Sequence, residues 1–213
     1  FGELREGWHD FWSRGWLWSI VIQFGIVNAA FAASVQVLGP SVAKQHLNGS
    51  GGWGLILAAE TLGLVLSGVF LLRWRPRHLL RTASFGAFGI ALLPLALARP
   101  LPLGGVVATA FAAGLCVEVF GVLWQTTMQQ EIPSAKLARL SSYDAVGSFA
   151  LMPIGYAVVG PIAATIGAGA TFLATALITV AATALVFLSR DVRTLQRRRH
   201  APEPLAEPDL VGN

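Results

Sequence analysis

The chain has 213 residues, of which 54% are hydrophobic and only 12% charged, and its formal net charge is +4. A soluble domain carries nearer ~25% charged residues, and here the apolar residues form long runs, so a typical soluble domain is excluded. The basic residues stand in short turns between these runs. This placement fits membrane orientation better than a phosphate-binding face, so we expect no nucleic-acid partner.

The first segment, residues 1–15, is polar but carries Leu4, Trp8, Phe11 and Trp12 at helical spacing. Indole rings prefer the headgroup level of a bilayer, so the pattern predicts an interfacial helix that leads into the membrane. An aromatic ligand cage is the alternative interpretation.

Six apolar runs follow, each long enough for the ~20 helical residues that cross a bilayer core. Their expected ranges are 16–38, 53–72, 79–98, 104–128, 144–167 and 170–189. We expect a loop over residues 39–52, and we expect Asp144 to open the fifth span, where its charge suits a helix N-terminus. The chain thus divides into a lead-in (1–15), a membrane domain (16–189) and a partly disordered cytoplasmic tail (190–213).

The Lys and Arg residues are distributed asymmetrically. Of the 15, all but Lys44 and Arg99 lie in segments that six spans would place on one side. Those segments are residues 1–15, 73–81, 131–144 and 190–213. The excess predicts that both ends of the chain are cytoplasmic. Arg greatly outnumbers Lys, and Ala and Gly are abundant, which is typical of a GC-rich bacterium and predicts a bacterial plasma membrane.

Polar side chains concentrate in particular spans. The first and fourth spans carry Gln23, Asn28, Gln36, Glu118 and Gln125, whereas the third and sixth are almost purely apolar. A carboxylate inside a span is costly and is a functional candidate that can take up a proton, which makes Glu118 the leading site residue. The alternative for Glu118 is a structural hydrogen bond to a neighbouring helix.

Several further residues are candidates with two interpretations each. Glu60, in the second span with small neighbours on its face, belongs to a substrate or proton pathway or to helix packing. Gln23, Asn28 and Gln125 are candidates for hydrogen bonds into a cavity, and helix packing remains open for Gln23 and Gln125. The single Cys116 lies in an apolar run, so no disulfide framework or metal cluster is expected.

The turns and the fifth span contain the remaining candidates. Arg73, Arg75 and Arg77 are orientation charges or gating contacts, and Arg139 and Asp144 are candidates for similar loop contacts. In the fifth span we expect Pro153, Gly160 and Pro161 to kink the helix.

Two short motifs resemble those of a known family. The stretch Gly68-Val-Phe-Leu-Leu-Arg73-Trp-Arg75-Pro-Arg77 is similar to the major facilitator loop signature Gly-x-Leu-Ala-Asp-Arg-x-Gly-Arg-Arg. Gly68, Arg73 and Arg77 match, while Leu72 and Arg75 replace Asp and Gly. Gly155-x4-Gly160-Pro161 resembles the antiporter glycine-proline motif. Residues 118–133, 139–144 and 151–155 look most like the branch with enterobactin exporters and macrolide efflux pumps.

The resemblance implies an all-α membrane protein with six transmembrane helices in a 3+3 inverted repeat. This would be the C-terminal half, helices seven to twelve, of a major facilitator transporter. The first helix of each repeat would line a cavity and the third would face lipid. The chain begins at Phe1 without a signal-peptide pattern, so we expect it to be part of a longer protein.

The implied function is proton-coupled efflux of an amphiphilic organic compound such as a drug, macrolide or siderophore. Its partners would be that small molecule, protons, the lipid bilayer and the N-terminal six-helix half. We expect no enzyme activity and no cofactor or metal, because the four histidines lie outside the spans and no phosphate-cradling loop is present. The alternative is a non-transporting six-span scaffold or assembly protein; a channel subunit is disfavoured because no selectivity-filter-like loop occurs.

Overall fold

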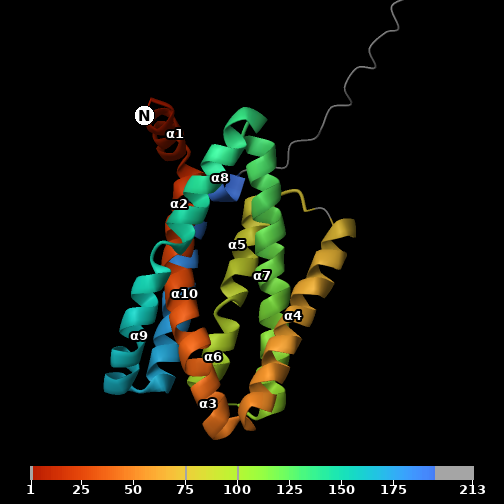
Figure 1. The fold of residues 1–213 in the computed structure, drawn as a ribbon. Helices are drawn as coiled ribbons and strands as arrows, with labels where there is room; N and C mark the ends of the chain where they lie inside the picture. The colour runs from red at the N-terminus through yellow and green to blue at the C-terminus, as the bar shows by residue number, and fades with distance from the viewer. Residues whose placement is uncertain (1, 75, 100, 195–213) are drawn as a thin grey trace, which may run out of the picture.

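The computed structural model describes residues 2–74, 76–99 and 101–194, and this part of the chain is helical without strands. The elements form an elongated bundle (Figure 1). They are α1 (Gly2–Trp12), α2 (Gly15–Phe31), the π-helix η1 (Ala32–Leu38), α3 (Gly39–His46), α4 (Gly49–Arg73), α5 (Leu79–Gly89), α6 (Leu92–Ala98), α7 (Leu103–Glu131), α8 (Ser134–Phe149), α9 (Met152–Ile166), α10 (Ala168–Phe187) and α11 (Arg190–Thr194).

Six stretches of these helices are long and apolar enough to cross a membrane. In chain order they are Gly15–His46, Gly49–Arg73, Leu79–Ala98, Leu103–Glu131, Ser134–Ile166 and Ala168–Phe187, which we call spans 1 to 6. The six spans expected from the sequence are therefore present, and they indicate a multi-pass membrane protein.

The loop expected over residues 39–52 is wrong. Span 1 continues from α2 through the π-helix η1 into α3, and Pro40 lies at the start of α3, directly after η1. The reversal into α4 occurs at Asn48 and Gly49, which both have positive φ, +61° and +72°. Asn and Gly tolerate this left-handed conformation better than other residues, so a very short connection suffices.

The expected start of the fifth span at Asp144 is also wrong. Helix α8 begins at Ser134, directly after Ile132 and Pro133, so Asp144 lies in the middle of the helix. Polar residues occupy the first turns of α8 because this end of the span projects beyond the apolar part of the bundle. The helix is interrupted between Phe149 and Met152, just before Pro153, whereas α9 continues through Gly160 and Pro161.

The spans pack in a definite pattern of pairs. Span 1 packs against span 5 through α2, η1, α8 and α9, and span 4 packs against span 2 through α7 and α4. Span 3 lies against span 4, and span 6 lies against span 1 and span 3. The described parts of the basic segments, residues 2–15, 73–74, 76–81, 131–144 and 190–194, lie at one end of the bundle, the upper end in Figure 1.

Close backbone approach at glycines holds both main pairs together. A Cβ on Gly63 of α4 would collide with the Phe111 carbonyl oxygen of α7, and a Cβ on Gly114 of α7 would collide with the Glu60 carbonyl oxygen of α4. Between α2 and α8, a Cβ on Gly25 would lie 2.7 Å from the Gly147 carbonyl oxygen. Since apolar surface gains little from leaving lipid, small residues that permit this close packing are a main source of association.

Span 3 is largely covered by its neighbours, whereas the third helix of a repeat was expected to face lipid. It is the most buried of the six, with 67% of its most apolar window covered. Gly86 and Gly89 of α5 lie directly against Cys116 of α7, and Ala83 and Ala87 are fully buried. The scarcity of polar residues in span 3 is therefore consistent with helix packing.

Spans 2 and 5 are the least covered, with 28% and 6% of their most apolar windows buried. Large apolar side chains project outward from both. On span 2 they include Leu62, Val65, Val69 and Phe70, and on span 5 Val146, Phe149, Ile154 and Ile162. Figure 1 places α4 and α9 on opposite flanks of the bundle.

The glycine contacts lead to a stability prediction. Gly114→Ala places a methyl group against the backbone of α4, so the helices must separate, and such overpacking typically costs about 1–3 kcal/mol. We expect a lower thermal unfolding temperature for the detergent-solubilised protein. Gly121→Ala is the matched control on the same helix, because nothing lies within 4 Å of its added Cβ. Equal melting temperatures for the two variants would contradict the proposed role of Gly114 in α4–α7 packing.

Candidate functional site

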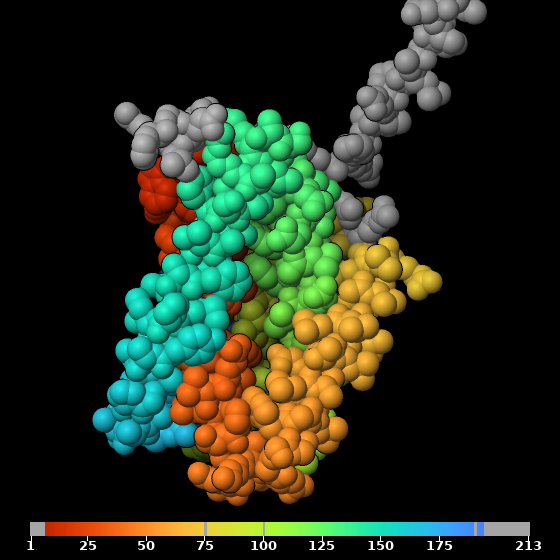
Figure 2. Space-filling view, viewed as in Figure 1, coloured from red at the N-terminus to blue at the C-terminus, as the bar shows by residue number. Residues whose placement is uncertain are grey.

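A small cavity lies between α2, α7 and α8, and we call it the α2–α7–α8 cavity. It has a volume of about 170 Å³. Its lining is Ile20, Phe24, Asn28, Phe120, Trp124, Gln125, Asp144, Ser148 and Phe149. In the space-filling view the surface is hollowed where α8 and α9 turn away from α7 (Figure 2). The cavity thus combines residues of spans 1, 4 and 5.

Aromatic rings form one wall of this cavity. Phe24 of α2 stacks on Phe120 of α7 with ring centroids 4.1 Å apart, and Phe120 stacks in turn on Trp124 at 6.2 Å. Trp16 meets the edge of Trp124 at 5.6 Å. Phe120 and Trp124 are four residues apart on α7, so both rings project from the same helix face. The ring stack keeps α2 and α7 apart and leaves space beside it.

Asp144 supplies the charge of the cavity. The indole Nε1 of Trp124 donates a hydrogen bond to its Oδ2 at 3.1 Å, and Ser148 Oγ donates to its Oδ1 at 3.2 Å. Asn28 of α2 donates from Nδ2 to the Ser148 carbonyl oxygen at 3.0 Å. These bonds fix the carboxylate at the junction of the three helices, with Gln125 exposed at the rim.

The predicted pathway residues separate into two groups. Asn28 and Gln125 lie together at the cavity, where they meet Asp144, which was expected to make a loop contact. Gln23 lies elsewhere: its Nε2 donates to Thr183 Oγ1 of α10 at 2.9 Å, and both side chains are buried. Gln23 therefore occupies a helix-packing position between spans 1 and 6.

Glu118 and Glu60 lie on the side of α7 and α4, away from the α2–α7–α8 cavity. The carboxylate of Glu118 lies beside Gly68, whose added Cβ would be 3.5 Å from Glu118 Oε1. Both Glu118 and Glu60 are half-buried. Within the described part of the chain, neither forms a side-chain hydrogen bond or ion pair, so the structural hydrogen bond considered for Glu118 is not found there.

The predicted gating residues lie at the basic end. Arg73 and Arg77 are exposed near the turn after α4, and Arg75 falls outside the described residues. Arg139 belongs to α8, where its side chain packs on Gly7 of α1, close to Tyr143. Helix α1 therefore rests on the span that carries Asp144.

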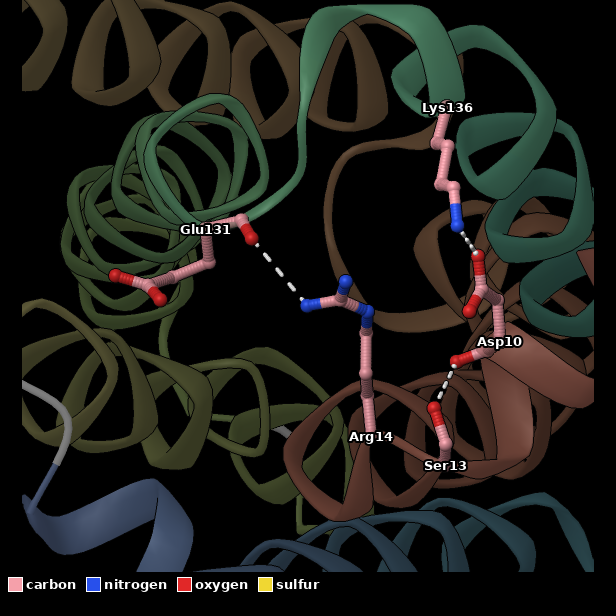
Figure 3. Close-up of polar contacts among 5 residues, drawn as sticks. All are labelled: Asp10, Ser13, Arg14, Glu131 and Lys136. Carbon is pink, nitrogen blue, oxygen red and sulfur yellow. Dashed lines mark hydrogen bonds and ion pairs between the residues drawn. The ribbon is translucent and has the colours of Figure 1, made fainter.

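A polar cluster also joins α1 to the ends of α7 and α8 (Figure 3). Lys136 Nζ donates to Asp10 Oδ2 at 2.6 Å, and Ser13 Oγ donates to the Asp10 carbonyl oxygen at 2.8 Å. Arg14 Nη1 donates to the Glu131 carbonyl oxygen at 3.3 Å. The hydrogen bond from Lys136 lowers the pKa of Asp10 below its ordinary value.

Sequence reasoning missed the residues that shape the cavity, namely Phe24, Phe120, Trp124, Ser148 and Phe149. The four-residue spacing of Phe120 and Trp124 on one face of α7 was an available signal. No comparable signal links them to Phe24 or Ser148, because those contacts depend on how separate helices pack.

Two other depressions are lined mainly by apolar side chains. One of about 600 Å³ runs between α2 and α10, and one of about 330 Å³ lies between α2, α9 and α10. Side chains such as Ile22, Ile26, Ile178 and Leu185 line them, which suits contact with lipid. Among the described residues, no three His, Cys, Asp or Glu side chains are grouped so that they could hold a metal ion.

Comparison with protein-family models gives no matching family, and comparison with curated proteins and with solved structures gives no match.

The Asp10–Lys136 contact leads to a prediction about α1. Lys136→Met removes the cation that faces Asp10, so α1 should detach from α8 more often and its amides should exchange hydrogen faster. The pair is partly exposed, so the loss is at most ~1 kcal/mol and added salt should reduce it. Because the pKa of Asp10 is lowered, the contact is complete above the ordinary carboxyl pKa and is lost only in more acidic solution.

Acidification from pH 7 to 5 should therefore leave the protection of the α1 amides unchanged, once the pH dependence of intrinsic amide exchange is corrected for. Ser13→Ala, which keeps both charges, is the control. If α1 exchanges equally in the wild type and in Lys136→Met, the aromatic packing of α1 on Tyr143 holds the helix without the ion pair.

Proposed function

We propose that the chain is the C-terminal half of a secondary transporter with the major facilitator fold, exporting an amphiphilic organic compound in exchange for protons. The observation that carries this proposal is the pattern of span pairs. In an inverted repeat, span 1 corresponds to span 4, span 2 to span 5 and span 3 to span 6. Under this correspondence the contact between spans 1 and 5 is equivalent to the contact between spans 4 and 2, and the contact between spans 1 and 6 to that between spans 4 and 3. All four contacts occur. Three-span repeats necessarily run in opposite directions, as an inverted repeat requires.

The glycine contacts support the same relation. Spans 1 and 5 approach closely at Gly25 and Gly147, and spans 4 and 2 approach closely at Gly114 and Gly63. The two equivalent pairs therefore have the same kind of close contact at glycine. A scaffold or assembly protein has no need for two matching triplets, whereas alternating access is built on such repeats.

The exposed apolar faces of spans 2 and 5 support a second six-helix unit as the partner. These faces lie on the flanks of the bundle. Packing within this chain buries only 6% of the most apolar window of span 5, and contact with another half would bury more of it. Between them lie α7 and α2 with the α2–α7–α8 cavity. A substrate route between two halves would then run past Gln125 and Asn28.

Glu118 is the residue to which we assign proton coupling. It is half-buried in span 4 without an ion pair among the described residues, and it lies against Gly68 of span 2, beside the exposed face of that span. A carboxylate in such a place changes its charge with the local environment and can exchange a proton during a conformational cycle.

Topology tests the membrane arrangement directly. A reporter fused after Asn48 should be periplasmic, and reporters fused after Arg77 or Arg193 should be cytoplasmic, because six spans and the distribution of basic residues place both ends inside. Alkaline phosphatase and green fluorescent protein fusions measure the two sides. Reversed readings at any two positions would contradict the proposed orientation.

A transport assay tests the proposed coupling in the chain joined to its six-helix partner. Glu118→Gln keeps the size of the side chain and mimics the permanently protonated form, so export driven by a pH gradient should fall at least tenfold while binding persists. The control is Leu95→Ala, which alters a side chain on α6 that is 52% exposed. Wild-type export by Glu118→Gln across a range of pH would assign coupling to another group. If cells that carry a transport-inactive variant such as Glu118→Gln keep every function of the protein, the scaffold or assembly role would be favoured.

A further inference from the structure

The α2–α7–α8 cavity has the composition of a site for an organic cation. Its wall is aromatic, with Phe24, Phe120 and Trp124 in a continuous stack and Phe149 at the exposed rim. Ring faces carry negative charge density and attract ammonium groups over distances up to ~6 Å. Among the described residues, no Lys or Arg lines the cavity, so its lining offers no positive charge to an anionic headgroup, whose charge Asp144 would repel.

The carboxylate of Asp144 has no positive partner within the part of the chain that the structure describes. Both of its hydrogen bonds come from neutral donors, the Trp124 indole and the Ser148 hydroxyl, and the described residues form no ion pair with it. A half-buried charge without a counter-ion is costly, and a bound cation would compensate it. The two donors also hold the carboxylate in a fixed position at the cavity.

We propose that the α2–α7–α8 cavity binds the ammonium headgroup of an amphiphilic amine or quaternary ammonium compound, with Asp144 as its counter-ion and the aromatic rings as its walls. The cavity, about 170 Å³, is smaller than the ~300–1,000 Å³ of pockets that enclose drug-sized ligands. It therefore encloses only the headgroup, and the apolar remainder of the bound ligand extends out of the cavity between the exposed side chains of Gln125 and Phe149. This inference names the substrate class within the proposed transport function and rests on it.

Binding of a defined probe to the complete chain in a neutral detergent tests the site without any transport step. Benzyltrimethylammonium carries the headgroup, neopentylbenzene replaces its nitrogen with carbon at nearly the same shape, and benzylsulfonate carries the opposite charge. Isothermal titration calorimetry should show binding of the cation, with affinities for the neutral and anionic compounds at least about tenfold weaker.

Two variants separate the carboxylate from the rings. Asp144→Asn keeps the shape of the side chain and removes its charge, and it should weaken cation binding about tenfold or more. Phe149→Leu changes a ring that is 54% exposed, so folding should persist while affinity falls about two- to fivefold. Asp191→Asn on α11, outside the cavity, makes the same change in net charge and should bind like the wild type.

The inference is overturned if Asp144→Asn binds the cation as well as the wild type, or if neopentylbenzene binds as tightly as benzyltrimethylammonium. These outcomes do not depend on transport. Cation binding that requires Asp144, together with no pH-driven export of the same cation by the chain joined to its partner half, would retain the site and reject the proposed function. Export driven by a pH gradient, together with cation binding that is the same in Asp144→Asn and in the wild type, would retain transport and reject the site.

Discussion

Contact between helix backbones at glycine is the constraint on which the rest of this fold depends. In a bilayer, apolar side chains gain little by leaving lipid, so helices associate where small residues let their surfaces approach. Gly63 and Gly114 bring α4 and α7 together, and Gly25 and Gly147 do the same for α2 and α8. A single methyl group added at Gly25, Gly63 or Gly114 meets a backbone carbonyl, which cannot move aside as a flexible side chain can. We call these two closely packed pairs, α4 with α7 and α2 with α8, the two units of the bundle.

The cavity results from the way in which these two units contact each other. Helices α2 and α7 meet through the rings of Phe24 and Phe120, whose centroids are 4.1 Å apart, whereas the helices within each pair meet through glycine. Large rings hold α2 and α7 apart, and the space beside them is lined by the polar groups of α8. Small residues thus set the strong contacts, and large aromatic residues set the open space.

The number of spans could be predicted from the sequence because a long apolar run is rarely compatible with anything except a membrane-spanning helix. Helix ends were less predictable. Residues 39–46 have the Gly, Pro and Ser content of a loop, yet span 1 continues through them as α3 and turns only at Asn48 and Gly49. The polar residues after Ser134 suggested a turn, but they form the first part of α8, which extends beyond the apolar layer. Composition alone does not reveal such an extension. The lack of polar groups in span 3 was compatible with lipid or protein on its surface, and the packing of its glycines on Cys116 decides for protein.

The candidate site was predictable only in part, for the same physical reason. Glu118 was the obvious residue because a charge inside a long apolar run is visible in one dimension. Asp144 was assigned to a loop because its neighbours Ser141, Ser142 and Tyr143 are polar. Its position became clear only when the length of α8 placed it opposite Trp124, one span away in the chain and 3.1 Å away in space. The hydrogen bond from Trp124 joins α8 of one packed pair to α7 of the other. A ligand that draws the Asp144 carboxylate toward itself therefore acts at the junction where the two units of the bundle meet.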